Sequence, residues 1–108
     1  MDSLTQVVRE EVGWYAGSGR GLNIALFRLF DDQHQTYAVV DVTFPNRSAE
    51  DYAAVVVFAR VVDDKVVIEQ DTTDKPLYKR LVQRGVPETQ IICAYAGEPI
   101  PDAERFVW

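Results

Sequence analysis

The segment 64–95 reads DKVVIEQDTTDKPLYKRLVQRGVPETQIICAY and decides the expected fold, because it carries signals for a strand, a helix and a second strand. Residues 65–71 alternate between apolar and polar side chains, as a half-buried strand does. Residues 76–84 place apolar side chains at helical spacing. Residues 91–95 form a short apolar run that favours another strand. The segment therefore predicts a strand, helix and strand in succession.

The ends of this helix carry polar and breaking residues for which we predict structural roles. Asp71, Thr73 and Asp74 lie between the strand and the helix, where short polar side chains bond backbone amides. Gly85 stands at the position of a C-cap, and Pro87 prevents the helix from continuing. We expect all five residues to act as turn and cap residues, with any ligand at the Asp71–Asp74 turn left open.

The rest of the chain completes an α+β pattern. Residues 3–15 have an apolar stripe at helical spacing, followed by three glycines that end the helix. Strands are expected at 22–30, 37–44 and 53–62, and in the second of these Ala38, Val40, Val42 and Phe44 share a face. The predicted fold is α+β: an N-terminal helix, a four-stranded antiparallel meander, a second helix and a short C-terminal strand, with the helices packed on one sheet face.

Length, charge and cysteine content restrict the kind of protein. The 108 residues fit one domain over 1–108, and the net charge of −6 disfavours a dedicated nucleic-acid binder. The single cysteine, Cys93, and the absence of an apolar leader indicate a cytoplasmic protein. The apolar run 53–59 is too short to span a membrane, which takes about 20 residues. No cofactor is expected.

Three carboxylates offer one alternative function. Asp41, Glu69 and Asp71 fall on neighbouring expected strands and resemble the carboxylate sets of metal-dependent nucleases and hydrolases. No lysine accompanies the Glu69–Asp71 stretch to stabilise charge, and Asp71 fits a strand-to-helix turn. The sequence therefore favours a protein without catalytic residues or bound metal, and keeps the metal-dependent enzyme as the rival.

Four basic residues and two aromatic residues are candidates for contact with a partner. Lys75, Lys79, Arg80 and Arg84 are expected to line the solvent side of the helix over 76–84, where they complement its dipole or touch an acidic partner or, weakly, DNA. Phe106 and Trp108 close the chain, and such aromatic ends either dock on the core or meet another subunit. We expect a homodimer that buries this aromatic tail.

Residues 65–95 resemble the XisI family of controlling factors for excision of the fdxN DNA element. Members show a K-I-W-I-Q-x-D-x-T-E run, a short helix, a G-I-P turn and an I-V-L-A-F strand. This chain has KVVIEQDTTD at 65–74, GVP at 85–87 and IICAY at 91–95. It departs from the family at Val67, which replaces a tryptophan, and at Phe58 and Ala96, which replace histidines.

The resemblance implies an accessory role. XisI-like proteins act beside a site-specific recombinase and accompany a second small protein, XisH, which has a nuclease-like fold. The resemblance thus implies a non-enzymatic protein that binds an XisH-like partner. An acidic protein of this kind could direct or restrain such a partner through charge complementarity.

Overall fold

The structure is a computed structural model that describes residues 3–21, 23–43, 48 and 51–106. Its six strands form one sheet and lie in sequence order: β1 (Arg20–Gly21), β2 (Ile24–Asp31), β3 (Thr36–Thr43), β4 (Ala54–Val62), β5 (Lys65–Asp71) and β6 (Ile91–Cys93). Neighbours from β1 to β5 are antiparallel, and β6 pairs in parallel with β5. The expected meander and C-terminal strand are confirmed.

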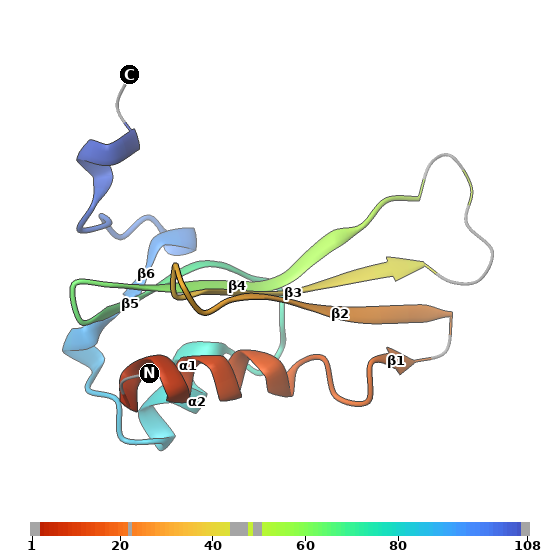
Figure 1. Ribbon diagram of the computed structural model, residues 1–108, viewed down its shortest axis with the longest axis horizontal. Helices are drawn as coiled ribbons and strands as arrows, with labels where there is room; N and C mark the ends of the chain where they lie inside the picture. The colour runs from red at the N-terminus through yellow and green to blue at the C-terminus, as the bar shows by residue number, and fades with distance from the viewer. Residues whose placement is uncertain (1–2, 22, 44–47, 49–50, 107–108) are drawn as a thin grey trace.

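Two helices cover one face of this sheet. Helices α1 (Ser3–Trp14) and α2 (Leu77–Gln83) lie on the same side in Figure 1, and three short 3-10 turns (Glu88–Gln90, Ala94–Ala96 and Ala103–Phe106) complete the chain. The predicted α+β class, with both helices on one face, is confirmed. Within the described residues, no helix has the length and apolar character needed to cross a membrane.

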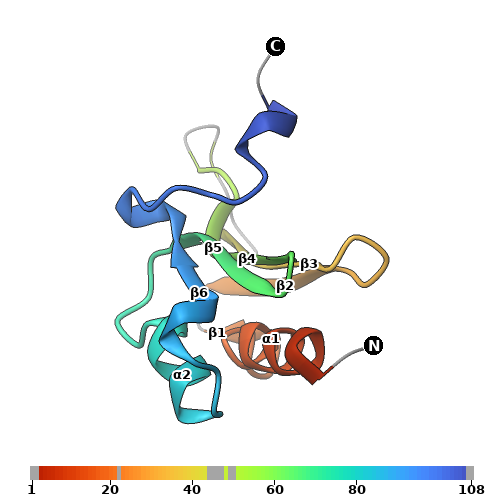
Figure 2. The ribbon, with the colours of Figure 1, turned by 90° about the vertical axis from the view of Figure 1, so that its left-hand side faces the viewer.

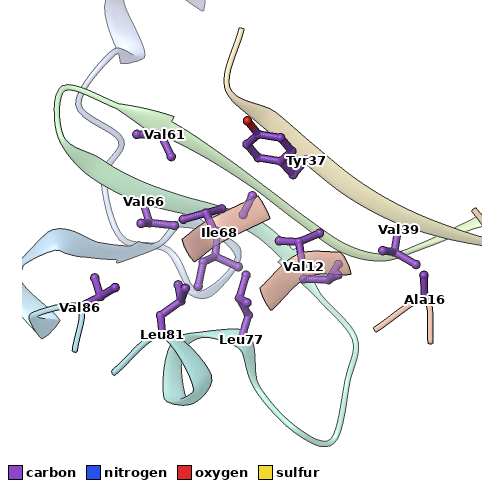
Figure 3. Close-up of a cluster of buried hydrophobic side chains, with 13 residues drawn as sticks. Val12, Ala16, Tyr37, Val39, Val61, Val66, Ile68, Leu77, Leu81 and Val86 are labelled. Atoms are coloured by element: carbon purple, nitrogen blue, oxygen red, sulfur yellow. The ribbon is translucent and has the colours of Figure 1, made fainter. Parts of the chain in front are cut away.

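The hydrophobic core lies between this sheet face and the helices (Figure 3). Val8 and Val12 of α1 and Leu77 and Leu81 of α2 are fully buried. They pack with side chains from the three central strands: Tyr37, Val39, Val57, Ala59, Val66 and Ile68. The helical spacing of the first set and the period of two in the second bring all these side chains to one layer.

The N-terminal edge of the sheet differs from the expectation. The glycine-rich stretch after α1 was expected only to end that helix, but Arg20 and Gly21 pair with Ala25 and Ile24 as strand β1. Asn23 lies in the connecting turn with φ 65°, which lets the chain reverse within a few residues. Leu22, expected to begin the first strand, lies outside the described residues.

The face of β3 that meets the core consists of Tyr37 and Val39, both fully buried. Ala38, Val40 and Val42 do share a face, and it is the opposite one, because they pair with Leu29, Phe27 and Ala25 of β2. Both faces of β3 are apolar, so alternation alone does not identify the buried one. Phe44 and positions 45–47 of the loop after β3 lie outside the described residues.

Candidate functional site

The basic residues in and next to α2 divide into two groups in the structure. Arg84 donates to Glu10 at 2.8 Å and to Glu11 at 2.7 Å, and Nε of Arg80 lies 2.9 Å from Glu11. The hydrogen bond from Arg84 lowers the pKa of Glu10, and that bond also raises the pKa of Arg84. Arg84 is exposed, as expected, and Arg80 is partly buried, but both are paired with the glutamates of α1 and are not free on the solvent side.

Aromatic side chains complete this seam between the helices. The Arg80 guanidinium lies 3.7 Å from the ring centroid of Trp14, and the Lys75 ammonium lies 5.7 Å from it. The Tyr15 hydroxyl donates to the carbonyl oxygen of Lys75. Lys79 is exposed on α2. The seam thus uses most of the expected basic ridge to hold the helices together, which weakens the case for DNA contact there.

The turn between β5 and α2 is organised by Asp71. One carboxylate oxygen accepts the backbone N–H and the hydroxyl of Thr73, at 2.9 and 2.6 Å. The other accepts the backbone N–H of Leu77 at 2.7 Å, one of the donors that the first turn of a helix leaves without an intrahelical partner. Asp74 is an exposed residue of the loop.

The C-terminal end of α2 is a Schellman motif. Gly85 has φ 93°, and its N–H donates to the carbonyl of Val82 at 2.9 Å. The N–H of Val86 donates to the carbonyl of Leu81 at 3.0 Å. This pair of bonds needs a left-handed residue at the glycine position, which other residues adopt at a cost. Pro87 then directs the chain into the 3-10 turn that precedes β6.

The three carboxylates of the enzyme alternative do not meet. Asp41 lies on β3, separated by β4 from Glu69 and Asp71 on β5. Glu69 accepts from Arg60 at 2.7 Å, whereas Asp71 is bound to the first turn of α2. In the described part of the chain, no three His, Cys, Asp or Glu residues are grouped as metal ligands. The geometry therefore does not favour the metal-dependent rival.

A buried ion-pair cluster lies on the face opposite the helices. Arg60 of β4 donates through both terminal nitrogens to Asp102, at 2.6 and 3.0 Å, and through Nε to Glu69. The side chains of Arg60 and Asp102 are 13% and 5% exposed. The bond from Arg60 holds the pKa of Asp102 below its ordinary value, and the same bond raises the pKa of Arg60. This bidentate pair is the strong form of an ion pair.

The cluster fixes residues 97–106, which we call the C-terminal tail, across one part of this face. Figures 1 and 2 show the tail on the side of the sheet away from α1 and α2. Val67 pairs with Arg60, so both point to this face, and Val67 is fully buried there. Phe106 is half exposed, with the Arg60 guanidinium 5.5 Å from its ring centroid. Trp108, the other predicted contact, lies outside the described residues.

A hollow of about 380 Å³ lies beside the tail. Its lining includes Thr36 at the start of β3, Arg60, Asp102 and Phe106. The volume of this hollow exceeds that of a single side chain. A long or charged side chain of a bound molecule therefore fits in it. The hollow therefore provides a space for a side chain of a bound molecule, next to the uncovered part of the sheet.

The uncovered part is an apolar surface on β2, β3 and β4, which we call the open face. Phe27, Leu29 and Val55 are 49%, 56% and 40% exposed. Cross-strand pairing puts further apolar side chains on the same side, because Phe27 faces Val40 and Val40 faces Val55. Ala38 and Phe58 also belong to this group, and both are partly buried. Contiguous exposed apolar side chains of this kind mark interaction surfaces.

The sequence of β2 carries a signal for the open face. Residues 24–31 read IALFRLFD, in which apolar side chains occupy both faces instead of alternating with polar ones. A strand covered on one side by helices needs polar residues on its other side unless that side is covered too or binds something. The partner of Arg60 was also missed, although an arginine within an apolar strand requires an acidic neighbour.

The fold and this surface define a class: a small α+β protein in which helices cover one sheet face and an apolar area remains open on the other. Residues 2–106 match the family model described as XisI protein. The chain therefore belongs to the XisI family. No curated protein matches it.

Two solved structures from Anabaena variabilis ATCC 29413 have a similar fold. One is a XisI-like protein with 19% sequence identity and a TM-score of 0.73; the matched region covers 95% of this chain and 91% of that protein's chain. The other is the fdxN element excision controlling factor XisI, with 17% identity and a TM-score of 0.71, covering 92% of each chain. At such identities, the likeness extends to the fold.

Proposed function

We propose that this protein is a non-enzymatic accessory protein that controls excision of a DNA element by binding a protein partner. Membership of the XisI family supports this role, as does the similar fold of a protein named an fdxN element excision controlling factor. The partner we propose is an XisH-like protein, in the cytoplasm. The dispersal of Asp41, Glu69 and Asp71 over separate interactions agrees with a role without catalysis.

The observation that carries the proposal is the open face. Phe27, Leu29 and Val55 form an apolar group that neither helix covers, since both helices lie on the other side (Figure 1). Burial of such side chains contributes about 25 cal/mol per Å² of apolar area removed from water. The hollow beside the tail adds a place where a polar anchor of the partner can reach Arg60 or Phe106.

The charge of the chain indicates the kind of partner. A net charge of −6 attracts a basic protein and speeds its diffusional approach. Nucleic-acid-binding proteins have basic surfaces, so a partner that acts on DNA meets this requirement. Association is then expected to slow as salt rises, while the apolar contact sets most of the dissociation rate.

The test is co-purification with the product of a neighbouring XisH-like gene, followed by titration of the purified components. Val55→Glu puts a charge on the open face and is expected to weaken binding at least tenfold, about 1.4 kcal/mol or more. Lys79→Glu on exposed α2 is the charged control. It changes the net charge by two units, against one for Val55→Glu, and is expected to bind within about twofold of the wild type.

Circular dichroism is used to establish that both variants are folded. Failure to recover any complex with an XisH-like protein would overturn the partner assignment. A complex that Lys79→Glu disrupts and Val55→Glu leaves intact would place the contact on the helix side, which contradicts the proposal.

A further inference from the structure

A second hollow, of about 300 Å³, lies beside the start of α2 on the helix side of the molecule. Its lining consists of Asp74, Lys75, Pro76, Lys79, Arg80 and Gln83. Three of these side chains are cationic at neutral pH, although the chain as a whole has a net charge of −6. The hollow also has room for several water molecules, each of which takes about 30 Å³. It therefore combines a local excess of positive charge with space for a small ligand.

The guanidinium of Arg80 is held in one orientation by two neighbours. It lies 3.7 Å from the ring centroid of Trp14, and its buried Nε lies 2.9 Å from the Glu11 carboxylate. A guanidinium has five N–H donors, and Nε carries only one of them. Among the described residues, none accepts a hydrogen bond from the two terminal nitrogens. These terminal donors are therefore oriented by the seam between the helices but not used by it.

Lys75 and Lys79 bring two ammonium groups to the same hollow. Both residues are exposed, and Nζ of Lys75 lies 5.7 Å from the centroid of the Trp14 ring that also holds Arg80. Neither lysine forms an ion pair with a described residue. Asp74 is the one carboxylate among the described lining residues. The positive charge at the hollow is therefore only partly balanced within the chain.

We propose that this hollow binds a phosphate group with two negative charges, as in inorganic phosphate or a phosphate monoester. The terminal N–H groups of Arg80 donate to two of its oxygens, because the planar guanidinium matches phosphate geometry in a bidentate way. The ammonium groups of Lys75 and Lys79 supply the remaining positive charge. Three cationic side chains at one hollow favour a ligand with more than one negative charge.

A phosphodiester of the DNA backbone offers similar oxygens but suits the hollow less well. Each diester carries a single charge, and a duplex brings one such charge for about every 1.7 Å of its length. The net charge of −6 repels a duplex, whose binding needs basic residues clustered over an extended surface. The neighbouring Arg84 does not extend the cationic group, because it is paired with Glu10 and Glu11. A small dianion is therefore the better ligand.

The test is an NMR titration of the full ¹⁵N-labelled chain with sodium phosphate at about pH 7.5, where a phosphate monoester is mostly dianionic. Sodium chloride keeps the ionic strength constant. Saturable chemical-shift changes are expected at the backbone amide of Lys79 and at the Nε–H of Arg80. Their absence would overturn the proposal, as would equal changes produced by chloride alone at the same ionic strength.

Three exposed variants that each change one charge separate the site from a general effect of net charge. Lys79→Gln is expected to weaken phosphate binding about threefold or more, whereas Asp74→Asn removes a repulsive carboxylate and is expected to strengthen it about twofold. Arg105→Gln removes a positive charge from the C-terminal tail, across the sheet, and is expected to bind within about 1.5-fold of the wild type. A loss in Arg105→Gln equal to that in Lys79→Gln, or a loss in Asp74→Asn, would overturn the proposal.

The source of the phosphate group is tested with two further ligands. A nucleoside 5′-monophosphate carries the dianion and is expected to bind like inorganic phosphate. A DNA duplex without terminal phosphates, at the same phosphate concentration, is expected to give no saturable shifts at these residues. A duplex that binds as tightly as the monophosphate, or in its place, would overturn the proposal. Since these titrations need no second protein, failure to find an XisH-like partner leaves them unaffected.

Discussion

The two faces of the sheet have similar composition and different surroundings. On the helix side, Val57 and Ile68 are fully buried beneath α1 and α2. On the other side, the tail covers Val67, whereas Val55 and Leu29 remain exposed. Apolar residues on the first face are explained by the core, and those on the open face are not. The difference separates the residues that hold the fold from those available for binding.

The largest expected effect comes from the same substitution on the two faces of β4. Val57→Ala removes buried methyl groups from the core and is expected to lower the free energy of unfolding by about 1.5–3 kcal/mol. Val55→Ala, on the open face, is expected to change it by less than about 0.5 kcal/mol. Urea denaturation of the isolated protein measures both. Equal losses would show that the open face is covered in the folded protein.

The C-terminal tail covers the part of the sheet next to the open face, and its attachment depends on Asp102. Asp102→Ala leaves Arg60 without its bidentate partner and is expected to cost about 1–3 kcal/mol. The tail should then be cleaved faster in limited proteolysis. Glu104→Ala, which changes an exposed carboxylate of the tail, is the control and is expected to behave like the wild type.

The same pair gives a pH dependence whose sign follows from the lowered pKa of Asp102. The stabilisation by the Arg60–Asp102 pair is fully present above the pKa of an aspartate in the unfolded chain, about 3.9. It is lost as the pH falls through the lower pKa of Asp102 in the folded protein. Wild type should therefore lose stability below about pH 4 more steeply than Asp102→Ala. Parallel acid titrations of the two proteins would contradict the role given to this pair.

A smaller effect is expected at the turn on the helix side. Asp71→Ala removes the acceptor of the Thr73 and Leu77 amides and is expected to cost about 1 kcal/mol, within the range of about 0.5–2 for lost helix caps. Asp74→Ala, in the same turn but exposed, serves as the matched control. If Asp74→Ala proves as costly as Asp71→Ala, the hydrogen-bonding account of this turn is wrong.

The smallest expected effect concerns the ionisation of Tyr15, which lies in the seam between the helices. Burial raises the pKa of Tyr15 to about 12. The neutral phenol is thus favoured by folding, and this contribution is lost as the pH rises from about 10, the unfolded value, through the folded pKa. Ultraviolet titration should show that Tyr15→Phe removes a component that ionises above about pH 11. An unchanged component above about pH 11 in Tyr15→Phe would contradict the burial of this hydroxyl in the seam.

The parts of the fold that the sequence predicts are those set by local chemistry. The helix and strand periods, the turn at Asp71 and the glycine at 85 all depend on neighbours within a few residues. The parts that it does not predict depend on distant segments. Arg60 pairs with Asp102, and Arg84 pairs with the glutamates of α1. These partners are far apart in the sequence, so the spacing of residues within one helix or strand does not predict the pairs.

The open face illustrates the same limit. Alternation on β3 shows two sets of side chains, Tyr37 with Val39 and Ala38 with Val40, and both are apolar. Which set is buried depends on where the helices dock, and this becomes visible only in three dimensions. The family resemblance covered nearly the whole chain and is confirmed by the match over residues 2–106, but it did not locate a surface.

Side-chain footprinting with a carbene reagent, with and without the XisH-like protein, tests the central claim most directly. The account predicts that the partner protects the peptides containing Phe27, Leu29 and Val55, while labelling of exposed Trp14 and Lys79 on the helix side is unchanged. Protection of Trp14 and Lys79 with continued labelling of Val55 would contradict the claim that the open face is the binding surface.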